Sequence, residues 1–232
     1  LVIIIPADNE VRSISQILEK IQRTRLIGET EKDILISDDG SKDSTSEKGR
    51  QCMQAHPYLD IHYHLHPFNQ GKGAALRTGI ALATGDWIII QDADLEYDPE
   101  DYNPLLQWVI ENDAKVVYGS RFLKPSNKHS YLRFYLGGRL VTFVTNLLYG
   151  QHLTDEPTCY KFFDAQFLKS IPLKCQGFEF CPEVTAKVCK QGIKIHEIPI
   201  NYYPRSIAEG KKINWKDGLE AIWTLLKYRF KN

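Results

Sequence analysis

The chain is poor in the residues that cross-link or anchor a fold. Its 232 residues include one methionine and five cysteines, which are Cys52, Cys159, Cys175, Cys181 and Cys189. Their number is odd and no pair has C-x-x-C spacing, which excludes a disulfide framework or a zinc site of that kind and indicates a reducing compartment. A signal peptide is missing, as is any apolar run approaching the roughly eighteen residues of a membrane span. Because Leu1 already lies in an apolar strand, we expect a longer protein that has room for membrane segments.

A large net charge is also lacking. Twenty-nine Lys and Arg balance 29 Asp and Glu, which gives no case for nucleic-acid binding. The charges are unevenly placed, however. Residues 86–101 hold seven acids and no base, residues 121–139 five bases and no acid, and residues 205–232 seven bases against three acids. Two basic segments beside an acidic one favour an anionic ligand or an anionic surface.

Short apolar runs alternate with segments of helical spacing along the first half of the chain. The spacing predicts strands over residues 1–5, 33–37, 61–65, 87–91 and 115–118, and helices over 11–26, 44–56, 72–83 and 105–112. This order predicts an α/β fold with a mostly parallel sheet. In the second half we expect helices over 131–149, 162–171, 182–191 and 215–230 and a strand over 195–199. Repeats, linkers and low-complexity tracts are absent, which favours one domain over residues 1–232.

Acidic residues follow the predicted strand at 87–91. Asp92, Asp94 and Glu96 alternate there, so in extended geometry their carboxylates share one side. Oxygen ligands in this arrangement suit Mg²⁺ or Mn²⁺, which in turn hold phosphates. The strand's carboxyl end is also where open parallel sheets bind ligands. The alternative is a solvated acidic turn before a helix that starts at Asp98 or Pro99.

Three further motifs each have two interpretations. The Asp38-Asp39-Gly40-Ser41 turn can bind a base or a ribose, or can simply cap a helix. Residues 71–76 satisfy neither G-x-G-x-x-G nor a P-loop, yet Lys72 at a helix start can contact a phosphate. Arg121, closing a strand, suits a bidentate phosphate contact or is a surface residue.

The ordered set of motifs resembles the GT-A glycosyltransferases of family 2, in the branch of dolichyl-phosphate mannose synthases and polyprenyl-phosphate glycosyltransferases. The resemblance covers essentially the whole chain. It rests on residues 5–10, 38–41, 69–75, 92–96 and 119–121, and then on 155–161, 177–180, 197–200, Arg205 and Gly210-Lys211-Lys212. It implies a GT-A fold, a nucleotide-sugar donor and a divalent metal ion. Residues 1–121 would form the nucleotide-sugar half, and residues 122–232 the acceptor half with a C-terminal helix.

The resemblance also implies roles for individual residues. Those of the nucleotide-sugar site would be Pro6, Ala7, Glu10, Asp39, Lys72, Asp92 and Ala93. The metal ligands would be Asp92, Asp94 and Glu96, with Glu96 where the branch usually has Gln. The residues facing donor diphosphate or acceptor phosphate would be Arg121, Arg139, Arg205 and Lys212. Cys159 and Cys181 depart from the branch, which has Gly and Asp there.

Three functions remain open at this stage. The first is an inverting transfer of a hexose from a UDP- or GDP-sugar to a polyprenyl or dolichyl phosphate at the cytoplasmic face of a membrane, with Asp94 and Arg121 in catalysis. The second is transfer to a glycan or protein hydroxyl, with Asp155 as the base. The third is a GT-A scaffold without turnover. The helix over 215–230 has an apolar side that can lie on an anionic bilayer or pack on the sheet.

Overall fold

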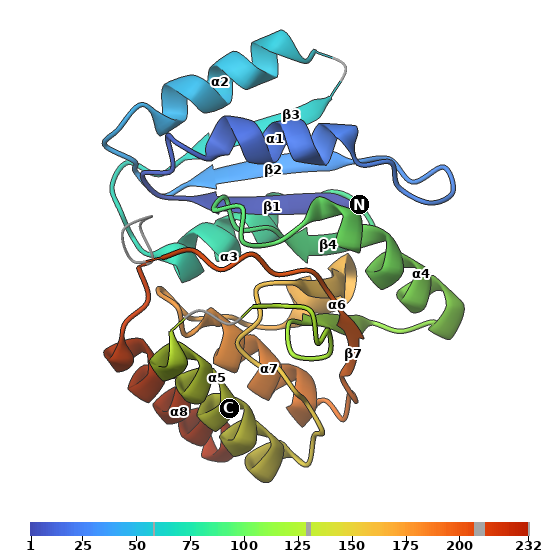
Figure 1. Ribbon diagram of the computed structural model, residues 1–232, viewed down its shortest axis with the longest axis vertical. Helices are drawn as coiled ribbons and strands as arrows, with labels where there is room; N and C mark the ends of the chain where they lie inside the picture. Colours follow the sequence, from blue (N-terminus) through green and yellow to red (C-terminus); the bar gives the residue numbers. More distant parts are fainter. Residues whose placement is uncertain (58, 129–130, 207–211, 232) are drawn as a thin grey trace.

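One sheet organises the molecule (Figure 1). The computed structural model describes residues 1–57, 59–128, 131–206 and 212–231. In these residues seven strands pair in the order β3-β2-β1-β4-β6-β5-β7. The strands are β1 (Val2–Ala7), β2 (Asp33–Asp38), β3 (Asp60–Leu65), β4 (Trp87–Ile90), β5 (Val116–Ser120), β6 (Lys161–Asp164) and β7 (His196–Pro199). The helices are α1 (Ile14–Arg23), α2 (Thr45–Ala55), α3 (Lys72–Leu82), α4 (Tyr102–Asn112), α5 (Leu132–Tyr149), α6 (Ala165–Ser170), α7 (Phe180–Lys190) and α8 (Trp215–Phe230), with a 3₁₀ turn η1 (Pro99–Asp101) before α4.

The predicted parallel half is confirmed. Strand β1 pairs in parallel with β2 on one side and with β4 on the other, and every residue of β1 is buried. An unbroken apolar run is what a central parallel strand needs, because both of its faces are covered. The register sets Ala7 beside Asp38. The carboxyl ends of these strands therefore open at one edge of the sheet.

The prediction of a helix over 162–171 is wrong in its first part. Residues Lys161–Asp164 form β6, which inserts antiparallel between β4 and β5, and only α6 that follows is helical. Phe162 and Phe163 point to opposite faces of the sheet and are both fully buried. The Asp164 side chain accepts a hydrogen bond from the Phe167 backbone N–H and thereby starts α6. The helix predicted over 105–112 also starts earlier: Asp98 caps the 3₁₀ turn that leads into α4.

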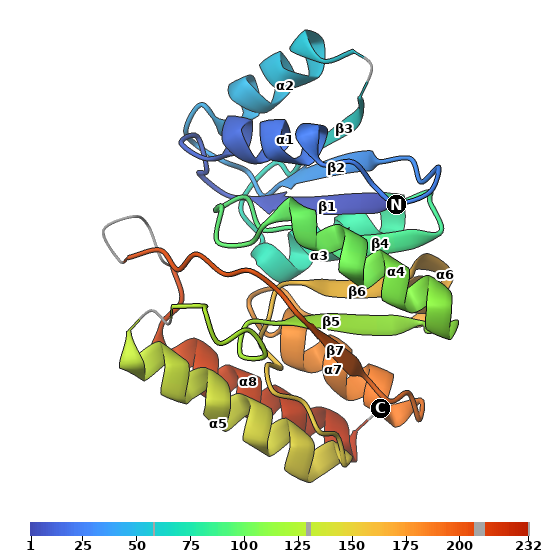
Figure 2. The ribbon, with the colours of Figure 1, turned by 45° about the vertical axis from the view of Figure 1, so that its right-hand side comes forward.

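Helices cover both faces of the sheet. Asn103 of α4 hydrogen-bonds the backbone of Ile27 and Arg25 just after α1, which ties these two helices together, while α1 packs on α2. Helix α3 packs on β1 and β2 and contacts α6. Beyond the β5–β7 end, α5 and α8 lie side by side in both views and form the outermost layer, with α7 packed against both (Figures 1 and 2).

The interpretation that α8 packs its apolar side on the sheet is wrong. Trp215, Leu219, Trp223 and Phe230 are all more than half exposed. The side that packs on α5 and α7 is instead built around Thr224, Leu225 and Tyr228. Across this contact the Tyr149 hydroxyl of α5 donates to the Leu225 carbonyl of α8. Among the described residues, no helix has both the length and the apolarity that crossing a bilayer requires.

Candidate active site

The acidic segment leaves the sheet at a firmly anchored point. Gln91 is fully buried directly after β4, and its Oε1 accepts hydrogen bonds from the hydroxyls of Tyr102 and Tyr160 at 2.6 and 2.5 Å. Three residues further on, Asp94 Oδ1 accepts from the Glu96 backbone N–H at 3.0 Å. Leu95 between them has φ +64°, which is uncommon for a non-glycine residue and typical of strain at functional sites. This turn brings Asp94 and Glu96 to the same wall of a cavity.

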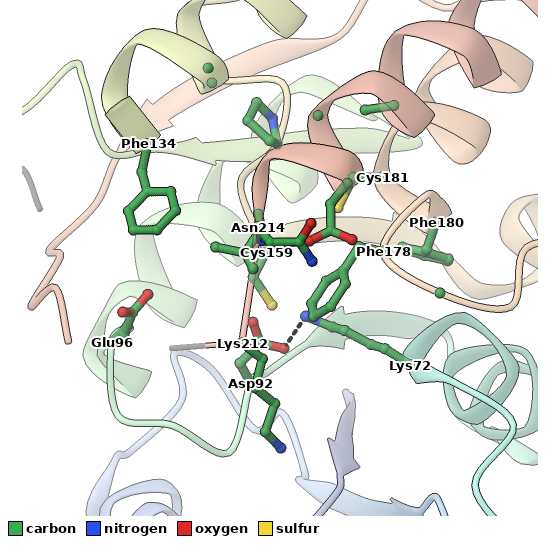
Figure 3. Close-up of a pocket in the computed structure, with 18 of the residues that line it drawn as sticks. Lys72, Asp92, Glu96, Phe134, Cys159, Phe178, Phe180, Cys181, Lys212 and Asn214 are labelled. Atoms are coloured by element: carbon green, nitrogen blue, oxygen red, sulfur yellow. Dashed lines mark hydrogen bonds and ion pairs between the residues drawn. The ribbon is translucent and has the colours of Figure 1, made fainter. Parts of the chain in front are cut away.

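Each of the three carboxylates faces a cation of the chain itself. Lys72 Nζ lies 2.6 Å from Asp92 Oδ1, as drawn in Figure 3. The Arg205 guanidinium lies 2.7 Å from Asp94 Oδ2, and the Arg205 backbone N–H donates to Glu96 at 2.8 Å. Arg205 arrives from a segment more than a hundred residues away in sequence. Two basic residues that belong to other elements thus offset part of the negative charge of the three acids.

Burial and mutual repulsion set the protonation of these acids. Burial raises the pKa of Asp94, the charges of Asp92 and Glu96 raise it further, and Arg205 offsets only part of this. For Asp92 burial acts in the same direction, but the ammonium of Lys72 outweighs it and the pKa is lowered. Asp94 is therefore the acid at this wall whose negative charge is least compensated by nearby cations.

The donor set suits a hard divalent cation at Asp94 and Glu96. Both offer carboxylate oxygens, and the Arg205 guanidinium that bridges them occupies the position of a cation. Among the described residues, Asp92, Asp94 and Glu96 do not bring one oxygen each within 4.8 Å of one another, because Asp92 is drawn to Lys72. Mg²⁺ or Mn²⁺ would fit here with Asp94 and Glu96 as direct ligands and Asp92 close by. The only described group that meets this distance criterion, Asp33, Asp60 and His62, lies at the amino ends of β2 and β3, where Asp33 and Asp60 are the first residues.

The end of β1 forms the opposite wall. Pro6, Ala7 and Glu10 all line the cavity. Lys212 Nζ lies 3.3 Å from Glu10 and 3.3 Å from Asp8. Arg205 reaches the same Glu10 at 3.7 Å. Of the predicted motif Gly210-Lys211-Lys212, the first two residues lie outside the described residues.

Asp39 serves the turn before α3. Its carboxylate accepts hydrogen bonds from the backbone N–H groups of Gln70 and Gly71 at 2.9 and 2.6 Å, and contacts the His66 ring at 2.9 Å. Gly71 has φ +96°, and a Cβ there would collide with the Gln176 carbonyl oxygen. This oxygen also accepts from the Ala74 N–H. The Gln176 backbone therefore covers part of the amino end of α3. The polar side chain that α3 contributes to the cavity is that of Lys72.

Arg121, directly after β5, forms a largely buried ion pair with Asp155. Asp155 is fully buried, and it accepts from the Arg121 backbone N–H and from Nε and an Nη of its guanidinium, at 2.9, 2.7 and 2.6 Å. Glu197 holds the other side of this loop by accepting from the Thr154 and Asp155 backbone N–H groups. Arg121 lines the cavity and Asp155 does not.

The predicted phosphate-binding residues differ in position. Arg205 and Lys212 join Arg121 in the cavity wall, but Arg139 does not. The Arg139 guanidinium donates to the Thr154 carbonyl and stacks over the Phe122 ring that Arg121 also contacts. Arg133 and Phe134, at the start of α5, also line the cavity and were not predicted as site residues. Their membership of the basic, aromatic segment 121–139 was the available signal.

The cavity has a volume of about 940 Å³ and changes character along its length. Its floor holds Lys72 and the acids at the end of β4, and Ala93 lies there almost fully buried. Figure 3 shows the thiols of Cys159 and Cys181 above Lys72, and Phe134 at the far side. Burial raises the pKa of both thiols. The remaining wall comes from the amino-terminal halves of α5 and α8 and is largely apolar.

Comparison with known proteins decides the family. Residues 2–171 match the family described as Glycosyl transferase family 2. The chain belongs to glycosyltransferase family 2. It is a glycosyltransferase with the fold expected for one, and the predicted family and fold are confirmed.

Relatives of this family 2 chain align over nearly all of it. It is 29% identical to a UDP-N-acetylglucosamine–dolichyl-phosphate N-acetylglucosaminyltransferase of Methanococcus voltae, over 91% of this chain and 89% of that protein. It is 24% identical to the low-salt glycan biosynthesis hexosyltransferase Agl6 of Haloferax volcanii, over 97% of this chain and 52% of that protein. Among solved structures, glucosyl-3-phosphoglycerate synthase from Mycobacterium tuberculosis in complex with Mn²⁺, UDP and phosphoglyceric acid is similar with a TM-score of 0.67. That alignment has 16% identity and covers 100% of this chain and 78% of the synthase, and it shows the shared fold.

Proposed function

We propose that this family 2 enzyme moves a hexose from a nucleoside diphosphate sugar to a polyprenyl phosphate, with inversion and with Mg²⁺ or Mn²⁺, at the cytoplasmic face of a membrane. The observation that carries the proposal is the single cavity that joins acids and cations at the strand ends to an apolar wall between α5 and α8. Such a cavity suits an acceptor with an anionic head and an apolar tail. The name of the Methanococcus voltae relative, which acts on dolichyl phosphate, supports the same acceptor class.

The donor would lie between the end of β1 and the acidic wall. Pro6, Ala7 and Asp39 line the part nearest β2, where a base and a ribose would fit. The diphosphate would then lie near Asp92 and Asp94. A uridine nucleotide is the first to test, because solved structures with this fold hold UDP.

The chain's own residues would exchange partners when the donor binds. Arg205 and Lys212 now pair with Asp94, Glu10 and Asp8. A donor diphosphate offers them stronger, bidentate phosphate contacts. A divalent cation held by Asp94 and Glu96 would supply charge stabilisation to the departing diphosphate. Arg205 would then lie against the phosphates instead of between the two carboxylates.

Transfer to a phosphate acceptor needs no strong base. An oxygen of the acceptor phosphate attacks the anomeric carbon, the bond from that carbon to the diphosphate oxygen breaks, and the nucleoside diphosphate leaves with the electron pair. In-line attack inverts the anomeric centre. The acceptor phosphate is already anionic near neutral pH, so the chain has only to position it. We assign this role to Arg121 and Arg133, which both line the cavity.

The alternative acceptor, a glycan or protein hydroxyl, fits less well. It requires Asp155 as a base, and that carboxylate is fully buried and already accepts three hydrogen bonds from Arg121. Its geometry favours a positioning role, in which Asp155 aims the Arg121 guanidinium.

The direct test measures nucleotide release with Mn²⁺ from UDP-N-acetylglucosamine, UDP-glucose and GDP-mannose, with and without a short-chain polyprenyl phosphate. We expect release of one nucleotide that depends on the lipid phosphate and is lost in Asp94→Asn. Asp113→Asn is the matched control, because Asp113 is exposed and its left-handed backbone tolerates Asn equally well. Release stimulated by a hydroxyl acceptor instead, or donor binding without turnover, would contradict the proposal.

A further inference from the structure

An apolar surface covers the outer side of the α5–α8 layer. Of the eighteen large hydrophobic side chains that are exposed among the described residues, eleven belong to α5, α8 or the residues just before them. We call this set the α5–α8 face; it comprises Tyr131, Leu132, Leu136, Leu140, Phe143, Leu147, Ile213, Trp215, Leu219, Trp223 and Phe230. Both views place the two helices together at the end of the molecule away from β3 (Figures 1 and 2). An exposed apolar surface of this extent marks an interaction site.

The face follows one side of each helix. On α5 the exposed residues recur from Leu132 to Leu147 at intervals of three or four, and on α8 Trp215, Leu219 and Trp223 are four residues apart. Residues at these intervals lie on one side of a helix. The opposite sides, which include Val141 and Leu225, are buried between the helices and α7. The outward apolar side chains therefore do not contribute to the core, and we expect another surface to cover them.

Charge identifies what covers it. Helices α5 and α8 carry five basic side chains, Arg133, Arg139, Lys216, Lys227 and Arg229, against the acids Asp217 and Glu220. One of the two acids, Asp217, is used in the capping box at the start of α8. The whole chain has a net charge of zero, so this layer is where a positive excess gathers. Apolar side chains with basic neighbours and two tryptophans are the pattern of a surface that enters the headgroup region of an anionic bilayer.

The face is also continuous with the active-site cavity. Leu140 of α5 and Trp215 and Leu219 of α8 belong both to the face and to the cavity wall. An amphiphile with its tail in a bilayer could therefore place its head in the cavity without leaving the membrane.

We infer that the α5–α8 face docks the enzyme on an anionic membrane, with the cavity mouth against the lipid surface. The inference rests on the proposed function for its purpose, since a lipid acceptor has to be collected from a bilayer. A second copy of the chain is the competing occupant. It would bring two positive faces together, which repel one another.

Binding to vesicles tests the inference. The wild-type chain is sedimented with phosphatidylcholine vesicles that contain or lack phosphatidylglycerol, at low and high salt, without donor sugar. The test variant is Phe143→Ser with Trp223→Ser, two residues that are 63% and 65% exposed and lie outside the cavity wall. The matched control is Leu82→Ser with Ile110→Ser, which are 48% and 58% exposed on α3 and α4.

We expect wild type and control to bind the anionic vesicles, and to bind them less tightly at high salt. The face variant should bind at least about tenfold more weakly than wild type. Urea unfolding checks that all three fold alike. Equal vesicle binding by the face variant and wild type, or no binding by wild type, would overturn the inference. So would a wild-type dimer in sedimentation velocity that becomes monomeric in the face variant, because a second copy would then cover the face.

The same samples separate the two proposals. Transfer to a water-soluble, short-chain polyprenyl phosphate without vesicles measures the proposed function alone. Transfer without vesicle binding would refute only the docking surface. Vesicle binding without transfer would refute only the proposal that the acceptor is a polyprenyl phosphate.

Discussion

Replacing Asp155 by Asn separates a positioning role from a basic one. The Asp155 carboxylate accepts three hydrogen bonds from Arg121, and its side chain is fully buried while that of Arg121 is 17% exposed. Asparagine offers one oxygen, and its NH₂ group would face the guanidinium donors. Removing one partner of a buried ion pair costs about 3–5 kcal/mol of unfolding free energy. Because Arg121 keeps some access to water, we expect a loss near the lower end, about 3 kcal/mol.

The assay has two parts. Urea unfolding measures the loss of stability, and steady-state transfer to polyprenyl phosphate measures kcat/KM across pH. A positioning role predicts a lower kcat/KM with an unchanged pH profile, because no proton passes through Asp155. It also predicts partial recovery in Asp155→Glu, which keeps the charge.

Glu183→Gln is the matched control. Glu183 is equally buried, pairs with Lys187 and accepts from the backbone N–H groups of Lys174 and Cys175, but it does not line the cavity. This variant should lose stability and keep kcat. The reasoning would be refuted if Asp155→Asn unfolded like wild type while losing the acidic, low-pH limb of its pH profile, because that limb reports the protonation of a carboxylate base.

Three further predictions concern the cavity wall and the sheet. In calorimetric titrations of UDP with Mn²⁺, Asp94→Asn should abolish metal-dependent binding, whereas Asp92→Asn should weaken it about ten- to a hundredfold, as an outer partner does; equal effects would contradict the assignment of ligands. Gly71→Ala should lower the urea midpoint, because its φ is +96° and its Cβ would meet the Gln176 carbonyl, while Gly137→Ala, with open space at its Cβ in α5, should raise stability by about 0.5–1 kcal/mol. Burial raises the pKa of Asp101 to about 6, so the folded state holds this proton more tightly than the unfolded chain. As pH rises from about 4 to about 6, the free energy of unfolding should therefore fall more steeply in wild type than in Asp101→Asn. Parallel profiles of the two proteins would contradict this assignment to Asp101.

The parallel half of the fold could be predicted because its signals are local. Continuous apolar runs such as Val2–Ala7 are typical of buried strands, and the acids after β4 follow from strand direction alone. Strand β6 was missed because it is only four residues long and is defined by partners far away in sequence. Short apolar runs do not distinguish a strand from the start of a helix.

Contacts between distant segments could not be predicted. The motif marked Arg205 as a phosphate ligand, but its approach to Asp94 depends on how residues 201–206 cross the sheet edge. Similarly, the apolar spacing of α8 correctly defined a stripe but not its direction. Periodicity reports which residues share a side of a helix; whether that side faces a core depends on neighbours that the pattern does not contain.

The inserted strand β6 and the segment after it also bear on how such enzymes can be recombined. The family match ends at residue 171, yet Glu197 fastens the Asp155 loop, Tyr202 donates to Glu96, and Arg205 completes the acidic wall. A chimera joined at residue 171 would take the acids after β4 and the Asp155 loop from one parent and these three supports from the other. Exchanges between relatives should therefore keep everything up to Arg205 from one parent and graft only the final helix, whose amino-terminal half lines the cavity.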